Sequence, residues 1–199
     1  MKSKTGSLQD EPVRYLDQGE LKRLLEAAKK RGIRDHLLLA LSYRLGLRAS
    51  EAIGLQLEDV DLPKGIIGVR GLKGGSARRY TFPRDLLPLA RRWVKARGDH
   101  AGSFFESRQG PGLSRQRAWQ IVKECAAAAG LPSWVRFHTL RHSIGTHLLD
   151  ARMPLETVAD VLRHRSPRSS ARYAVTSLRR REDYQREMER SPEIVKVKP

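Results

Sequence analysis

The sequence predicts an α+β fold that is mainly helical and carries one small three-stranded antiparallel sheet. Apolar residues recur at helical spacing along most of the 199 residues. Between about residues 59 and 82, short strand-like runs separated by Gly- and Pro-containing turns replace that pattern. The length suits a single domain, and we find neither an internal repeat nor a low-complexity segment.

Three helices are expected before the strands. Asp17 can cap a first helix that runs to about Lys30. A second helix is expected over residues 33–44, with Gly46 placed to end it. A third helix is expected to begin at residue 49 or 50 and to run to about residue 57.

The predicted sheet consists of three short runs at residues 59–61, 65–70 and 78–82. The turns between them contain Pro63-Lys64-Gly65 and Lys73-Gly74-Gly75-Ser76. Connections this short favour antiparallel pairing of neighbouring strands, because parallel strands need a long crossover.

Helices resume after the predicted sheet and continue to the C-terminal end. Ser114 is a typical N-cap for a helix that runs to about residue 129. Tyr173 is expected on or beside a short helix, ahead of a charged tail helix. The other expected helices cover residues 85–96, 139–151, 155–162 and 177–190.

The strongest compositional signal is a large positive charge. Lysine and arginine number 39 against 22 aspartate and glutamate, which gives a net charge of +17 and a pI near 10.7. The excess is spread along the chain, as in a domain with a basic face that attracts a polyanion such as nucleic acid. Charge alone does not separate an enzyme from a ribosomal or chromatin-like binder.

Other compositional features indicate a cytoplasmic protein without a membrane partner. The single cysteine, Cys125, excludes an internal disulfide framework and is interpreted as small core filler. Residues 1–12 are polar, are expected to be flexible and do not resemble a secretory signal. The longest apolar run, residues 37–41, is far too short to cross a bilayer.

Four places in the chain carry residue types suited to chemistry, although each is ordinary when taken alone. Arg48 in GLRASE would be a surface residue or the partner of Glu51, and Lys73 an exposed turn lysine. His138 and Arg141 lie three residues apart, as a capping histidine and a surface arginine would at a helix start. Tyr173 would be a half-buried aromatic residue.

We expect neither a metal site nor a cofactor. His138 and His142 have the spacing at which two helical histidines can share zinc. His147, however, falls about 140° further round a helix of 3.6 residues per turn. No cysteine or nearby carboxylate pair completes a ligand set.

Taken together, these residues suit phosphodiester cleavage. Two guanidiniums offer forked donors to the charge that builds on the phosphate oxygens. A histidine can donate to the same oxygens or accept a proton, and a lysine on a turn can protonate the leaving oxygen. A tyrosine can act as a covalent nucleophile once it has lost its proton.

At these residues the chain resembles the tyrosine recombinases, the family of Xer proteins and phage integrases. GLRASEAIGLQLEDVD and RFHTLRHSIGTHLLD are similar to the family's two arginine segments. His164 stands nine residues before Tyr173, which is the family's usual step to the nucleophile. The resemblance covers about residues 13–178 and therefore implies the integrase catalytic fold for most of the chain.

The resemblance implies a role for each matching position. Tyr173 would attack the scissile phosphate and form a 3′-phosphotyrosyl link. Arg48 and Arg141 would hold the phosphate, supported by Glu51 behind Arg48. Lys73 would protonate the leaving oxygen, His138 would accept or place the tyrosine proton, and His164 would bond the phosphate. Because the covalent link keeps the energy of the broken bond, rejoining would need neither ATP nor metal.

Three features depart from the family pattern. The step from Lys73 to Pro83 is about two residues longer than usual, and Arg163 stands where a glycine usually precedes the last histidine. The N-terminal core-binding domain of most members is absent, so the chain is either a catalytic fragment or a short recombinase. Residues 179–199 are expected to form a tail helix that can dock on a neighbouring subunit.

The expected partner is double-stranded DNA, on which the chain would assemble as a homo-oligomer, from dimer to tetramer. The helix that begins after Ser114 presents Arg115, Arg117 and Lys123 as candidate DNA contacts, or alternatively as a solvated basic face. Site-specific recombination is the leading interpretation. The alternatives are DNA relaxation of the type IB topoisomerase kind and a non-catalytic DNA-binding regulator on the same fold.

Overall fold

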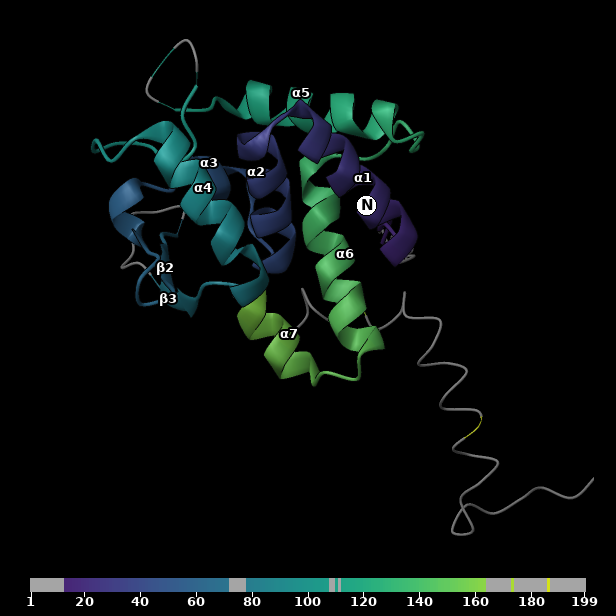
Figure 1. Cartoon of the computed structure of the whole chain (residues 1–199). Coiled ribbons are helices and arrows are strands. Elements are labelled where there is room, and N and C mark those ends of the chain that lie inside the picture. Colours follow the sequence, from purple (N-terminus) through teal and green to yellow (C-terminus); the bar gives the residue numbers. More distant parts are fainter. Residues whose placement is uncertain are drawn as a thin grey trace, which may run out of the picture. The chain divides into compact units, whose positions relative to one another are not determined.

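The chain divides into two compact units. A computed structural model describes residues 13–71, 78–107, 110, 112–163, 173 and 186. The larger unit is Tyr15–Ile144, and the smaller consists of Met1–Arg14 together with Gly145–Pro199. Figure 1 shows the larger unit as a group of helices with a short sheet at one side, which confirms the predicted mainly helical α+β class.

Helix α1 (Gln18–Arg31) begins at the predicted cap. The Asp17 carboxylate accepts the Glu20 backbone N–H at 2.7 Å, and the Glu20 carboxylate accepts the Asp17 N–H at 3.0 Å. This reciprocal capping box satisfies two backbone donors that a helix start otherwise leaves unpaired. Gly32, at φ 137°, then separates α1 from helix α2 (Ile33–Arg44), as the spacing predicted.

Helix α2 is the central helix of the larger unit. Its residues 37–43 are all buried, including four leucines without exposed surface. A helix that is apolar on every side is stable only when neighbours cover it completely. In Figure 1 it lies between α1 and helix α4 (Leu87–Arg97), and it contacts both.

Helix α3 (Ala49–Ile53) is shorter than predicted. It ends at Ile53, with Gly54 as its C-cap, instead of at residue 57, and a 3₁₀ turn over Leu57–Asp59 follows it. The Leu57 N–H donates to the Gly102 carbonyl at 2.8 Å, and Gln56 forms a β-bridge with Ser103. These contacts with a loop distant in sequence end the helix early. The local sequence pattern could not have predicted them.

The predicted three-stranded antiparallel sheet is confirmed, with strand order β1-β2-β3. Its strands are β1 (Val60–Asp61), β2 (Ile66–Val69) and β3 (Arg78–Thr81). The pairs Val60–Ile67 and Val69–Arg78 fix the register. The connection between β2 and β3 therefore contains Lys73, which itself lies outside the described residues.

The later helices follow the sequence closely. Helix α4 starts after a 3₁₀ turn at Arg84–Leu86, and helix α5 (Arg115–Ala128) is capped by Ser114, whose hydroxyl accepts the Arg117 N–H at 3.0 Å. Helix α6 (Phe137–Asp150) begins two residues earlier than predicted. Its first turns up to Ile144 belong to the larger unit.

The smaller unit contains the end of α6, helix α7 (Leu155–Val161) and the single helical residues Tyr173 and Arg186. The predicted flexible segment 1–12 and most of the predicted tail helix lie outside the described residues. In the part of the chain that is described, no helix is long and apolar enough to span a membrane.

Cys125 is buried in α5, as predicted for core filler. Its burial raises the pKa of the thiol to about 11. Because the thiolate is the reactive form of cysteine, this residue is unreactive near neutral pH.

Arg163 follows helix α7 in a left-handed conformation, with φ 52°. Its backbone N–H donates to the Asp160 carbonyl at 2.9 Å, which closes the end of the helix. Glycine is the residue that favours this position, because a Cβ atom there meets the following carbonyl. The arginine that departs from the family pattern thus carries local backbone strain.

We predict that Arg163→Gly stabilises the fold by about 0.5–1 kcal/mol, since relief of the strain exceeds the extra chain entropy of glycine. Urea unfolding measures the difference. Arg163→Ala is the control, because it removes the hydrogen bond from Nη1 to the Val161 carbonyl and keeps the Cβ atom. An equal gain in Arg163→Ala would assign the effect to the side chain and contradict the strain argument.

Candidate functional site

Arg48 is the N-cap residue of α3, and the buried carboxylate of Glu51 holds it in place. One Glu51 oxygen accepts the Arg48 backbone N–H at 2.9 Å, and the other accepts its guanidinium at 2.6 Å. The Glu51 side chain is 2% exposed and that of Arg48 is 31% exposed. Glu51 therefore fixes the start of α3 and directs a guanidinium that still reaches solvent.

Arg141 is buried on α6, with 1% of its surface exposed, which excludes the alternative of an ordinary surface arginine. Its Nη1 donates to the Gly46 carbonyl at 2.6 Å across 95 residues of sequence. Gly46 stands two residues before Arg48, in the turn between α2 and α3, and has φ 56°. The structure thus brings the second arginine to the turn that leads into the first.

His138 and His142 lie one turn apart near the start of α6. Their ring centroids are 4.4 Å apart with the planes at 81°, an edge-to-face arrangement. His138 is exposed and His142 is partly buried. His138 and Arg141 therefore share the first turns of one helix, as predicted, although only His138 is open to solvent.

Ser143 ties the same helix to the start of the larger unit. Its hydroxyl accepts the Leu16 backbone N–H at 2.9 Å and donates to the Thr139 carbonyl at 2.9 Å. All three residues are buried. These bonds hold in place the first half of α6, which carries His138 and Arg141.

Tyr173 packs within the smaller unit against Gly145 of α6. The tyrosine is 1% exposed. A Cβ atom at Gly145 would lie 3.1 Å from two atoms of the Tyr173 ring and 3.1 Å from Leu162 Cδ1. Sequence reasoning missed Gly145, although a glycine inside a helix is itself a signal of close approach by another group.

Two predicted site residues, Lys73 and His164, lie outside the described residues. Among the residues that the structure describes, no three histidine, cysteine, aspartate or glutamate side chains form a group that could hold a metal ion.

The three candidate DNA contacts on α5 do not share one face. Arg115 is exposed, whereas Arg117, about 200° further round the helix, directs its Nη1 to Gln120 at 3.2 Å and Glu124 at 3.4 Å. Lys123 donates to the Ser133 carbonyl and lies 5.8 Å from the centroid of the exposed Trp119 ring. Arg117 therefore faces the corner between α1 and α2.

Comparison with known proteins agrees with this fold. The phage integrase family matches residues 14–179, nearly the whole chain. Tyrosine recombinase XerA of Pyrococcus furiosus is 38% identical over 154 residues, which are 76% of this chain and 53% of XerA. The chain thus spans about half the length of that relative.

A second relative, type 1 fimbriae regulatory protein FimE of Escherichia coli K12, is 33% identical over 174 residues, covering 84% of this chain and 88% of FimE. Among solved structures, the XerH site-specific recombinase in a post-cleavage complex with its difH substrate superposes with a TM-score of 0.77 at 25% identity. That superposition covers 90% of this chain and 54% of XerH. The chain therefore belongs to the phage integrase family and has the fold of a tyrosine recombinase catalytic domain.

Proposed function

We propose that this chain cleaves and rejoins DNA through a 3′-phosphotyrosyl link to Tyr173, as one step of site-specific recombination. The observation that carries the proposal is the hydrogen bond from Arg141 to the Gly46 carbonyl. It joins α6 to the turn before Arg48 and thus supports a single site for two guanidiniums from segments far apart in sequence. The match of residues 14–179 to the phage integrase family supports the same assignment.

Arg48 and Arg141 would hold the scissile phosphate. Each guanidinium stays protonated at any working pH and presents forked donors that match phosphate oxygens. Glu51 would position Arg48 without contacting DNA, because both of its oxygens already accept bonds from Arg48. A donor that is fixed before the reaction stabilises developing charge without the cost of reorientation.

His138, Lys73 and His164 would handle protons and further phosphate contacts. His138 is exposed at the start of α6, where it can reach a bound phosphodiester. Lys73 would protonate the leaving 5′-oxygen from the connection between β2 and β3. His164 would bond the phosphate. The phosphotyrosyl link would conserve the energy of the cleaved bond, so we expect no requirement for metal or ATP.

A conformational step belongs to this mechanism. Arg141 and Tyr173 are each 1% exposed. A phosphodiester therefore reaches them only after the atoms that cover them have moved. Such gating steps occur on microsecond to millisecond timescales in many enzymes and often limit their rates.

The proposed partners are double-stranded DNA and further copies of the chain, from dimer to tetramer, assembled on that DNA. The charge of +17 favours DNA of any sequence. We also propose a cytoplasmic location, because the single cysteine provides no disulfide framework.

We predict that the chain forms an SDS-resistant covalent adduct with a nicked suicide substrate in EDTA, and that Tyr173→Phe forms none. Phenylalanine fills almost the same buried volume and lacks the attacking oxygen. Denaturing gel electrophoresis detects the adduct. An adduct in Tyr173→Phe would exclude this nucleophile, and an adduct lost only in EDTA would exclude metal independence.

Two further outcomes of the same experiment separate the alternatives. If the chain binds DNA without forming an adduct on any substrate, the non-catalytic regulator is the better description. If an adduct forms and a supercoiled plasmid is relaxed by the monomer without strand exchange, the topoisomerase-like activity is correct.

We predict that Arg48→Lys lowers the single-turnover rate of adduct formation by roughly 100-fold or more, the usual effect of losing one donor to developing charge. Lysine keeps the positive charge and loses the fork that spans two oxygens. Arg44→Lys on α2, an exposed arginine paired only with Asp85 among the described residues, is the matched control. Equal rates in Arg48→Lys and in the parent would contradict the phosphate-holding role.

We predict that Glu51→Ala lowers the free energy of unfolding by about 1–3 kcal/mol, as a helix cap and a partly buried ion pair are lost together. Glu51→Gln should cost less, because the amide oxygen still accepts one bond. Urea unfolding compares the two. Breaking the exposed Lys64–Asp61 pair gives the reference. If Glu51→Ala lowered the free energy of unfolding by less than that, Glu51 would not support this turn.

A further inference from the structure

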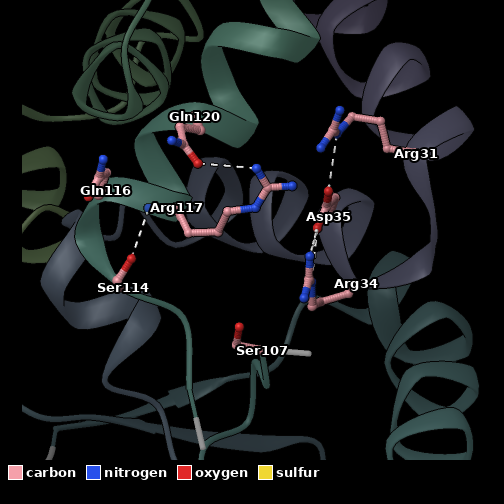
Figure 2. Close-up of a pocket in the computed structure, with 8 residues that line it drawn as sticks. All are labelled: Arg31, Arg34, Asp35, Ser107, Ser114, Gln116, Arg117 and Gln120. Atoms are coloured by element: carbon pink, nitrogen blue, oxygen red, sulfur yellow. Dashed lines mark hydrogen bonds and ion pairs between the residues drawn. The ribbon is translucent and has the colours of Figure 1, made fainter. Parts of the chain in front are cut away.

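A cavity of about 680 Å³ lies in the larger unit between the α1–α2 corner and the first turns of α5. Figure 2 shows the guanidiniums of Arg31, Arg34 and Arg117 around it. Asp35 is the only carboxylate among the described lining residues. The cavity takes none of its lining from the predicted catalytic residues, so it is a separate feature of the molecule.

Asp35 is already committed to two of these arginines. Its side chain is 6% exposed. One oxygen accepts the Arg31 Nε–H at 3.1 Å, and the other accepts the Arg34 Nε–H at 2.9 Å. The dashed lines in Figure 2 mark these bonds. The carboxylate therefore fixes both guanidiniums at the wall of the cavity, and its single negative charge neutralises only one of their two positive charges.

Donors remain for a ligand. Arg117 makes only the long Nη1 bonds to Gln120 and Glu124, at 3.2 and 3.4 Å, so its Nε and Nη2 have no partner within the described chain. Arg31 donates from Nε to Asp35 and from Nη2 to Glu124 at 2.6 Å. Its Nη1 therefore also has no partner within the described chain. Partial burial opposes the charge on Arg31, but the bond to Asp35 and the charge of Glu124 raise its pKa above the ordinary value.

Neutral polar groups complete the lining. The hydroxyls of Ser107 and Ser114 and the amides of Gln116 and Gln120 belong to the same wall. Such groups donate to phosphate oxygens and do not repel them. Because Asp35 already holds two of the arginines, an anion would bind with little loss of side-chain freedom.

We propose that this cavity binds a backbone phosphate of duplex DNA, away from the phosphate that is cleaved. The choice of DNA rests on the proposed function, and the choice of phosphate rests on the guanidinium forks and the hydroxyl and amide donors. The contact is independent of base sequence and anchors α5 against the DNA. Arg117 then contacts the phosphate from α5, and Arg31 and Arg34, which Asp35 holds in place, contact it from the α1–α2 corner.

Gln120 allows a test that separates charge from folding. It is partly exposed, lines the cavity and contacts Arg117. Gln120→Glu places a carboxylate against the Arg117 guanidinium, whereas Gln120→Lys adds a fourth cation to the cavity. Both variants lose the same amide, so a purely structural effect would change DNA affinity in the same direction in both.

The dissociation constant for a short duplex of arbitrary sequence is measured between roughly 50 and 200 mM salt, the range over which phosphate contacts dominate the change. All variants are made in the Tyr173→Phe background, which cannot form the proposed covalent link. Gln120→Glu should weaken binding by roughly tenfold, the size of one charge-assisted contact, and Gln120→Lys should strengthen it. The log–log salt slope should become shallower by about 0.9 in the first and steeper in the second.

The control is Arg92→Gln on α4, an exposed position outside the cavity that removes the same unit of charge as Gln120→Glu. An equal loss of affinity in this control would show that the effect comes from net charge alone, and it would overturn the proposal. Unchanged affinity in both Gln120 variants, or a change of the same sign, would also overturn it. Failure of the proposed function is distinct, because it appears as a missing adduct in the unmodified chain and not as a change in these binding curves.

Discussion

The hydrogen bond between Arg141 and the Gly46 carbonyl is the interaction on which the candidate site depends. It gives a hydrogen-bond donor to a carbonyl in a tight turn and an acceptor to a buried guanidinium. A buried charge without partners is strongly unfavourable. Because Arg141 is buried, its guanidinium needs this bond, and the bond holds α6 and the α2–α3 turn together. The same turn leads directly into Arg48 and therefore sets the position of that residue.

Polar groups inside the larger unit serve mainly to orient other groups. Both Glu51 oxygens accept hydrogen bonds from Arg48, and the two Asp35 oxygens accept hydrogen bonds from Arg31 and Arg34. The Ser143 hydroxyl joins Leu16 to α6. Each is a short acidic or hydroxyl side chain buried beside longer partners. In two of these cases the result is a fixed guanidinium, which is what recognition of phosphate requires.

Much of the fold was predictable because its signals are local. The caps at Asp17 and Ser114 and the short strand runs between turns depend on a few neighbouring residues, and the structure has them where the sequence indicated. The early end of α3 was not predictable, because it depends on backbone bonds to residues 102 and 103. The strain at Arg163 lies between these cases, since only comparison with a family pattern marked it.

By itself, the sequence predicted the strand runs, the family and the approximate course of the helices, and it marked the positions for which the family implies a catalytic role. Tertiary structure alone decided that Arg141 is buried instead of exposed, that Tyr173 packs on Gly145, and that three arginines share one cavity. Caps and periodicity follow from the geometry of neighbouring residues. Burial and clustering follow from which distant segments pack together, and residue order does not encode that packing locally.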